Sequence, residues 1–349
     1  SGHPLDGGTY TIASGAYTIT IGAAGDTVNV VGTLQNNGSA VEVDSVTFKE
    51  GGTNFTNSLL VGTNSTGTLD AATGNIGVGT GVFGALTSGD NNVAVGLNAL
   101  DLNTTGSCNV AVGSSSLDSN TTGSNNIAIG HGALQANTTN SNSTAIGNCA
   151  LFVSTGQRNT AVGSCSLSSN TTGTNNVASG YRSMAANTEG CKNSAYGYQS
   201  LDSNTTGENN TALGLDALAG NTTADNNTAV GMCALVSNTT ASCNTAVGTE
   251  SLKLTTTGCR NTAVGTTSLK ENTTGDANVA IGRAALICAT TADSNTAVGF
   301  DSMQATTTGA ENTSIGANSL FSNTTGCQNM ASGVSTMYTN TEGCQNTAS

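Results

Sequence analysis

The sequence predicts an all-β protein that folds as a repetitive β-solenoid or β-roll of 17-residue coils, preceded by an N-terminal β module. Three observations predict this architecture: a strict internal repeat, an unusual composition, and short alternating segments ahead of the repeat. Self-similarity at a fixed period is the sequence signature of solenoid folds, so the repeat is the strongest of the three.

The repeat begins near residue 75, where the motif Asn-(Thr/Val)-Ala-Val-Gly first appears. Its consensus is N-T-A-V-G-x-x-S/A-L-x-x-N-T-T-G-x-x, and successive glycines are 17 residues apart, except that Gly163 follows Gly147 by 16. The missing residue falls in the N-T-T-G segment, which is typical of a turn that tolerates length changes. We therefore expect a β-solenoid of about sixteen repeats over residues 75–349.

The composition favours a thin, elongated structure and excludes some partners. Only 8% of the 349 residues are charged and 3% are aromatic, whereas an ordinary globular domain is about 25% charged. The net charge of -13 repels phosphate backbones and anionic lipid headgroups, so we expect no nucleic-acid and no membrane partner. No apolar run approaches the roughly 20 residues that span a bilayer.

Within each repeat we interpret T-A-V as a short strand, the following glycine as a corner, x-x-S/A-L-x-x as a second strand or one helical turn, and N-T-T-G as the return turn. The large apolar residues recur just before the glycine, as at Val95, and four residues after it, as at Leu100. We expect both columns to point into the coil. The asparagines of the return turn either form amide ladders along the stack or are exposed residues that favour the turn.

The segment before the repeat also predicts β structure, but without the 17-residue period. Apolar residues alternate with polar ones at Tyr17–Ile21, Val28–Val31 and Val41–Val43, between Gly, Asn and Asp turns. We interpret residues 1–74 as an N-terminal β module or cap. Its strands are suited to add to the open edge of another copy, which would give an end-to-end filament.

Each coil has few large side chains, and this scarcity favours burial against other chains. Two aliphatic residues and an alanine offset little of the entropy lost when 17 residues are ordered. We therefore expect self-association, most simply as a parallel homotrimer, while a self-closed monomeric coil stays open as the alternative.

The repeats resemble the tandem-repeat regions of phage tail-fibre proteins, which often precede a chaperone domain of the endosialidase type. More loosely, Asn126-Ile127-Ala128-Ile129-Gly130 is similar to units in the heads of trimeric autotransporter adhesins, which are β-rolls. The resemblance covers residues 75–349 and implies a trimeric, non-enzymatic, extracellular fibre. Its function would be that of a fibre shaft or filament subunit.

Cysteines at matching positions of neighbouring coils are candidates for disulfides, because stacked coils bring Cα atoms within about 5 Å. Many N-x-S/T sequons are also possible N-glycosylation sites, although a repeat rich in Asn and Thr produces sequons by composition alone. The candidate disulfide pairs are Cys149 with Cys165, Cys243 with Cys259, and Cys327 with Cys344, and the candidate sequons include Asn103, Asn120, Asn137, Asn204, Asn238, Asn272 and Asn323.

Motifs of catalysis are missing, so we expect no enzyme, no cofactor and no metal site: the sequence has no G-x-S-x-G, H-E-x-x-H or P-loop motif. Tyr181 and Tyr198 each follow the glycine of successive coils and could stack on a sugar ring, or they are ordinary variation at an exposed corner. Besides a structural fibre, the sequence leaves open a glycan-binding adhesin head that recognises cell-surface glycans, or an ice-binding solenoid. Regular threonine rows would favour ice binding, but Thr160 and Thr211 alternate with valine and isoleucine in that row.

Overall fold

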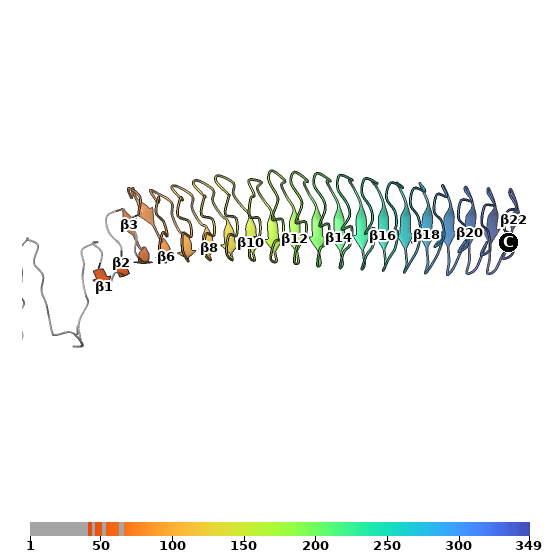
Figure 1. The fold of residues 1–349 in the computed structure, drawn as a ribbon, viewed down its shortest axis with the longest axis horizontal. Coiled ribbons are helices and arrows are strands. Elements are labelled where there is room, and N and C mark those ends of the chain that lie inside the picture. Colours follow the sequence, from red (N-terminus) through yellow and green to blue (C-terminus); the bar gives the residue numbers. More distant parts are fainter. Residues whose placement is uncertain (1–40, 44–45, 51–53, 63–65) are drawn as a thin grey trace, which may run out of the picture. The chain divides into compact units, whose positions relative to one another are not determined.

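The structure is a computed structural model that describes residues 41–43, 46–50, 54–62 and 66–349. The chain divides into two units, Ser1–Asn37 and Gly38–Ser349, and the described residues all belong to the second. In that unit the described residues form a stack of coils that contains strands and turns but no helix (Figure 1). The predicted β-solenoid is therefore confirmed, whereas residues 1–40 of the predicted N-terminal module lie outside the described residues.

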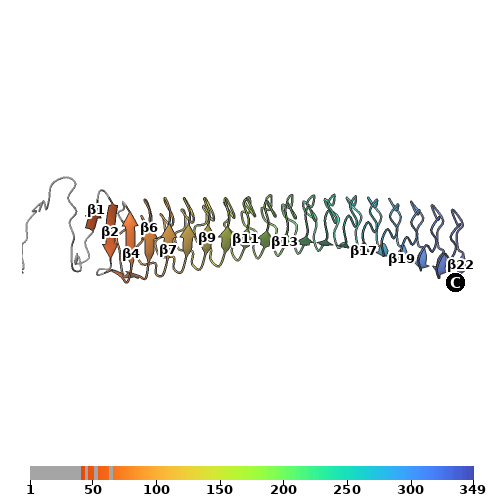
Figure 2. The ribbon, with the colours of Figure 1, turned by 90° about the horizontal axis from the view of Figure 1, so that it is seen from below.

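The stack begins with antiparallel strands and continues with parallel ones. Strand β1 (Val41–Val43) pairs with β2 (Val46–Glu50), and β2 pairs with β4 (Leu59–Gly62), both in antiparallel fashion. Strand β4 then pairs in parallel with β6 (Ile76–Val78), so the parallel ladder already includes residues before 75 (Figure 2). A separate two-stranded sheet joins β3 (Phe55–Thr56) to β5 (Ala72–Thr73).

From β6 onward each coil contributes one short strand, and every strand pairs in register with the strands one coil away. Ala94 lies opposite Ala111, for example, and Thr144 lies opposite Thr160 across the 16-residue step. The strands are β7 (Val93–Val95), β8 (Val110–Val112), β9 (Ile127–Ile129), β10 (Thr144–Ile146), β11 (Thr160–Val162), β12 (Val177–Ser179), β13 (Ser194–Tyr196), β14 (Thr211–Leu213), β15 (Thr228–Val230), β16 (Thr245–Val247), β17 (Thr262–Val264), β18 (Val279–Ile281), β19 (Thr296–Val298), β20 (Thr313–Ile315), β21 (Met330–Ser332) and β22 (Thr347–Ala348).

The segment after the corner glycine is neither the second strand nor the helical turn that we expected. Gly96 has φ 134°, and a Cβ there would lie 2.6 Å from the carbonyl oxygen of Gly113. Asn98 and Leu100 then adopt left-handed conformations with φ 54° and 52°, which belong to no regular strand or right-handed helix. These turns still bond coil to coil, since the Leu100 N–H donates to the Ser116 carbonyl at 3.1 Å.

The interior confirms one of the two predicted buried columns and contradicts the other. Leu100 and its equivalents up to Leu320 are fully buried, and Met337 in the last coil is half-buried. The column of Val95 instead faces outward, where Ile129 is 38% exposed. Because side chains alternate across a strand, the inward position is the central one, which alanine occupies, as at Ala94. Each coil therefore buries one large aliphatic side chain together with alanine, serine and asparagine.

Asparagine ladders fill the rest of the interior and confirm the first of the two interpretations of the turn asparagines. The Asn120 Nδ2 donates to the Asn103 Oδ1 at 2.8 Å and to the Gly123 carbonyl at 3.0 Å, and both asparagines are fully buried. A second ladder, which the sequence analysis did not predict, uses the asparagine that precedes the strands from β6 onward, with Ser143 in its place before β10. Its Asn92 backbone N–H donates to the Asn75 Oδ1 at 2.9 Å.

The first ladder is interrupted where the coil carries another residue in the asparagine position. At three interruptions, the last asparagine before the gap keeps a buried Oδ1 without a hydrogen-bond partner. These oxygens belong to Asn137, Asn238 and Asn272, which precede Ser154, Thr255 and Ala289 in the next coils.

Candidate functional site

One outward surface of the stack is flat, regular and without charge. We call it the sheet face: it comprises the first and third residues of each strand from β6 to β21, whose side chains point away from the coil interior. Many of these side chains are aliphatic and well exposed to solvent, including Ile76 (45%), Val78 (41%), Leu213 (48%) and Ile315 (49%). Exposed apolar surface of such length is a common mark of an interaction surface.

Charged residues are confined to the other sides of the coil. No strand from β6 to β21 carries Asp, Glu, Lys or Arg, although the whole chain has a net charge of -13. The ion pairs among the described residues lie in the turns. Lys253 and Lys270, for example, have ammonium nitrogens 2.7 and 2.9 Å from the carboxylate of Glu250. These two lysines lower the pKa of the Glu250 carboxyl through hydrogen bonds.

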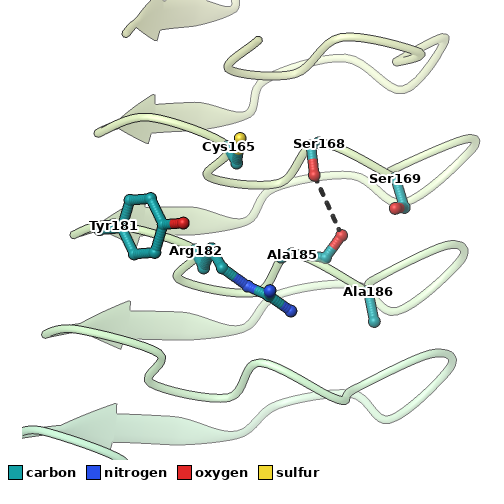
Figure 3. Close-up of a pocket in the computed structure, with 7 residues that line it drawn as sticks. All are labelled: Cys165, Ser168, Ser169, Tyr181, Arg182, Ala185 and Ala186. Carbon is teal, nitrogen blue, oxygen red and sulfur yellow. Dashed lines mark hydrogen bonds between the residues drawn. The ribbon is translucent and has the colours of Figure 1, made fainter. Parts of the chain in front are cut away.

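A shallow hollow lies around the corner from the sheet face, next to the predicted glycan-contact residues. We call it the tyrosine hollow. It has a volume of about 310 Å³ and is lined by Cys165, Ser168, Ser169, Tyr181, Arg182, Ala185 and Ala186 (Figure 3). The structure brings the two predicted tyrosines together, because the rings of Tyr181 and Tyr198 stack with centroids 5.5 Å apart and an interplanar angle of 22°.

An ion pair crosses the edge of this hollow. The Arg182 Nη2 is 3.2 Å from the Asp202 Oδ2, and Asp202 raises the pKa of the Arg182 guanidinium. The other oxygen of Asp202 is buried and has no hydrogen-bond partner among the described residues. Arg182 was not among the residues that the sequence singled out, and nothing in the sequence paired it with Asp202. Their relation depends on which turn positions face each other in adjacent coils, which the spacing alone does not reveal.

The predicted disulfides are not formed in the structure, where all ten cysteines are free thiols. Cys149 and Cys165 lie in adjacent coils, and burial, followed by the neighbouring Cys165, raises the pKa of the Cys149 thiol. The nearest approach is that of Cys327 and Cys344, whose Sγ atoms are 2.8 Å apart. Cys243 and Cys259 differ in phase, because they lie twelve and eleven residues after their respective glycines.

The asparagines of the candidate sequons lie inside the coil. All seven are at most 1% exposed, and the side-chain amide of each donates hydrogen bonds within the stack, as the Asn204 Nδ2 does to the Asn187 Oδ1 at 2.7 Å. A glycan on this nitrogen would replace an N–H of the ladder and would have no room. Glycosylation and the observed packing are therefore mutually exclusive at Asn103, Asn120, Asn137, Asn204, Asn238, Asn272 and Asn323.

The described residues contain neither a metal-binding cluster nor a membrane-spanning helix. Across residues 54–62 and 66–349, His, Cys, Asp and Glu side chains nowhere gather in a group of three that could hold a metal ion. None of the chain that the structure describes forms a helix long and apolar enough to cross a bilayer. No family model, curated protein or solved structure matches this sequence.

Proposed function

We propose that the chain is a non-enzymatic structural protein, the shaft or subunit of an extracellular fibre, in which copies associate through the sheet face. The observation that carries the proposal is the absence of charge from this one surface of an acidic protein. Two copies that each carry a charge of -13 repel one another in most orientations. The sheet face is the surface where they can approach without burying a charge.

The size and period of the sheet face favour a second copy as its occupant. Strands about 4.8 Å apart make β6 to β21 roughly 75 Å long, and three residues make each strand about 10 Å wide. The resulting area of roughly 750 Å² is close to the ~800 Å² per partner of a stable protein interface. Another copy also has the same spacing between its coils, so rows of valine and isoleucine can interdigitate along the whole length.

A parallel homotrimer, with three sheet faces around one axis, is the simplest closed arrangement of this kind and agrees with the resemblance to fibre proteins. The end-to-end filament predicted through the module at residues 1–74 depends mainly on residues outside the described part of the chain, and it stays a prediction. An ice-binding role is less well supported, because Ser179, Tyr196 and Leu213 interrupt the row at the third strand position.

The experiment is to place aspartates on the sheet face and to measure the native mass. In the double variant Val230→Asp/Val264→Asp the interface would have to bury carboxylates, so we expect a folded monomer. The matched control, Thr240→Asp/Thr274→Asp, adds the same charges to exposed turn residues of the same two coils. Analytical ultracentrifugation of the wild type and the control should give an oligomer.

Two results would contradict the proposal. One is a wild-type chain that sediments as a monomer at tens of micromolar. The other is an oligomer that persists unchanged in Val230→Asp/Val264→Asp. Circular dichroism of each variant shows whether the coils remain folded, so that a loss of mass is not mistaken for unfolding.

A further inference from the structure

The tyrosine hollow interrupts the regular surface of the stack, and its cause lies in the sequence of two adjacent coils. Ala185 and Ala186 form part of its lining at two turn positions, and the first of these positions is occupied by Asp202 in the next coil and by Phe152 two coils earlier. Ser168 and Ser169 occupy the same two positions one coil earlier. Four small residues in two adjacent coils therefore leave a depression that the larger neighbours fill elsewhere.

Aromatic side chains concentrate beside this depression. Tyr181 and Tyr198 are 47% and 49% exposed, and the next residues in the same row are Ser164 and Leu215, so the aromatic stack is confined to two coils. The π face of an aromatic ring is electron-rich and attracts the polarised C–H groups that a pyranose presents on one side. In Figure 3 the Tyr181 ring lies next to Arg182 at the edge of the hollow.

Hydrogen-bonding groups of both kinds lie within reach of the same depression. Arg182 supplies guanidinium N–H donors, and the hydroxyls of Ser168 and Ser169 can donate or accept. The Ser168 Oγ makes only a long bond, 3.4 Å, to the Ala185 carbonyl, so it is available to a ligand. Asp202 holds Arg182 in place, because the Arg182 Nη2 donates to the Asp202 Oδ2 at 3.2 Å.

We propose that the tyrosine hollow binds a neutral saccharide, with one sugar ring packed against Tyr181 and its hydroxyls bonded to Arg182, Ser168 and Ser169. A sugar ring combines an apolar C–H side with a rim of hydroxyls, which is the combination that these residues complement. The ligand is neutral because Asp202 already compensates the charge of Arg182, and the net charge of -13 repels an anionic glycan. This binding site is separate from the sheet face and does not depend on the proposed fibre assembly.

The test is saturation-transfer NMR of the full chain with four neutral probes, lactose, maltotriose, methyl mannoside and N-acetylglucosamine, and with sialyllactose as the anionic counterpart of lactose. We expect saturation of the C–H protons of at least one neutral probe and a weaker signal from sialyllactose. Tyr181→Ala should weaken that binding about tenfold, because it removes the aromatic contact. Arg182→Gln should weaken it as well, while the native mass of the protein stays unchanged.

The matched control uses a second stacked aromatic pair, also among the described residues. Phe321 and Tyr338 have centroids 4.8 Å apart, but the tyrosine hollow is not beside them, so Tyr338→Ala should leave binding unchanged. The proposal would be overturned if none of the neutral probes binds at about 10 mM, a concentration on the order of the dissociation constant of the weakest contact of this kind. Equal loss of binding in Tyr181→Ala and Tyr338→Ala, or tighter binding of sialyllactose than of lactose, would also overturn it.

Discussion

Replacing Thr255 by asparagine should repair a break in the first asparagine ladder and stabilise the stack. The Asn238 Oδ1 is buried without a partner on one side of Thr255, and on the other side the Asn272 Nδ2 makes only a 3.4 Å bond to the Thr255 hydroxyl. In intact parts of the ladder the corresponding bond is 2.8 Å long, as between Asn238 and Asn221. An asparagine at this position would restore both contacts.

The expected gain follows from the groups involved. A buried polar atom without a partner costs about 1–3 kcal/mol, and a new buried hydrogen bond contributes about 1 kcal/mol. Threonine and asparagine have similar volumes, so we expect little steric cost and a net stabilisation of about 1–2 kcal/mol for Thr255→Asn. Since 1.4 kcal/mol corresponds to a factor of ten, amide exchange in the coils around residues 238–275 should slow about five- to thirtyfold.

Hydrogen exchange followed by mass spectrometry measures this effect locally, which matters because coils of a solenoid can open separately. Thr255→Val is the control: it keeps the branched shape but supplies no amide, and it should speed exchange slightly. If Thr255→Asn leaves exchange in these coils unchanged or makes it faster, the ladder does not contribute to stability in the way described.

The remaining predictions concern the buried leucine, the corner glycine and the reactive thiol. In the Val230→Asp/Val264→Asp background, Leu252→Ala should lower the free energy of unfolding in urea by about 2–5 kcal/mol, and Val247→Ala by less than about 1 kcal/mol. The reason is that only the leucine is fully buried within the coil. Equal losses in the two variants would contradict the assignment of the interior. Gly265→Ala should destabilise the stack by at least about 2 kcal/mol in thermal unfolding, and Thr266→Ala should hardly change its stability. The reason is that Gly265 has φ 133° and a Cβ there would lie 2.5 Å from the Gly282 carbonyl oxygen. Iodoacetamide at neutral pH should alkylate Cys344 before Cys288. Hydrogen bonds from the Cys327 thiol and backbone N–H lower the pKa of Cys344, whereas burial and then Glu271 raise the pKa of Cys288. Peptide mass spectrometry that finds the opposite order of alkylation would refute this reasoning.

The repeat period, the T-A-V strands and the glycine corner could be predicted from the sequence, because each depends on local spacing. The inward side of the strand could not, since Val95 is larger than Ala94 and size alone assigns valine to the interior. The left-handed Leu100 follows from closure of the coil, and most side chains are disfavoured in that conformation. Sequence reasoning gave no role to the asparagine that precedes the strands and so missed the second ladder.

The saccharide site proposed at the tyrosine hollow could likewise be predicted only in part. The alignment of Tyr181 with Tyr198 could be predicted from their equal phase in the repeat, and the structure places their rings in a stack. The hollow beside them could not be predicted, because it depends on which turn positions of adjacent coils lie together, as Ser168 and Ala185 do and as Arg182 and Asp202 do. That relation depends on the path of the turns, which the sequence pattern left undecided between a strand and a helical turn.

The register of the parallel ladder has a consequence for how such a chain can change in length. Every strand from β7 to β21 pairs only with the strand before it and the strand after it. The first threonine of the N-T-T-G turns bonds to the neighbouring coils in the same way: the Thr104 Oγ1 donates to the Thr121 carbonyl at 3.0 Å, and the Thr104 carbonyl accepts from the Thr87 Oγ1 at 2.9 Å. An inserted or deleted repeat therefore recreates at its junction the same contacts that were there before. Unequal recombination between repeats in the gene would lengthen or shorten the stack in whole coils without a misfolded intermediate, so related genes are expected to differ in repeat number more readily than in the sequence of a coil.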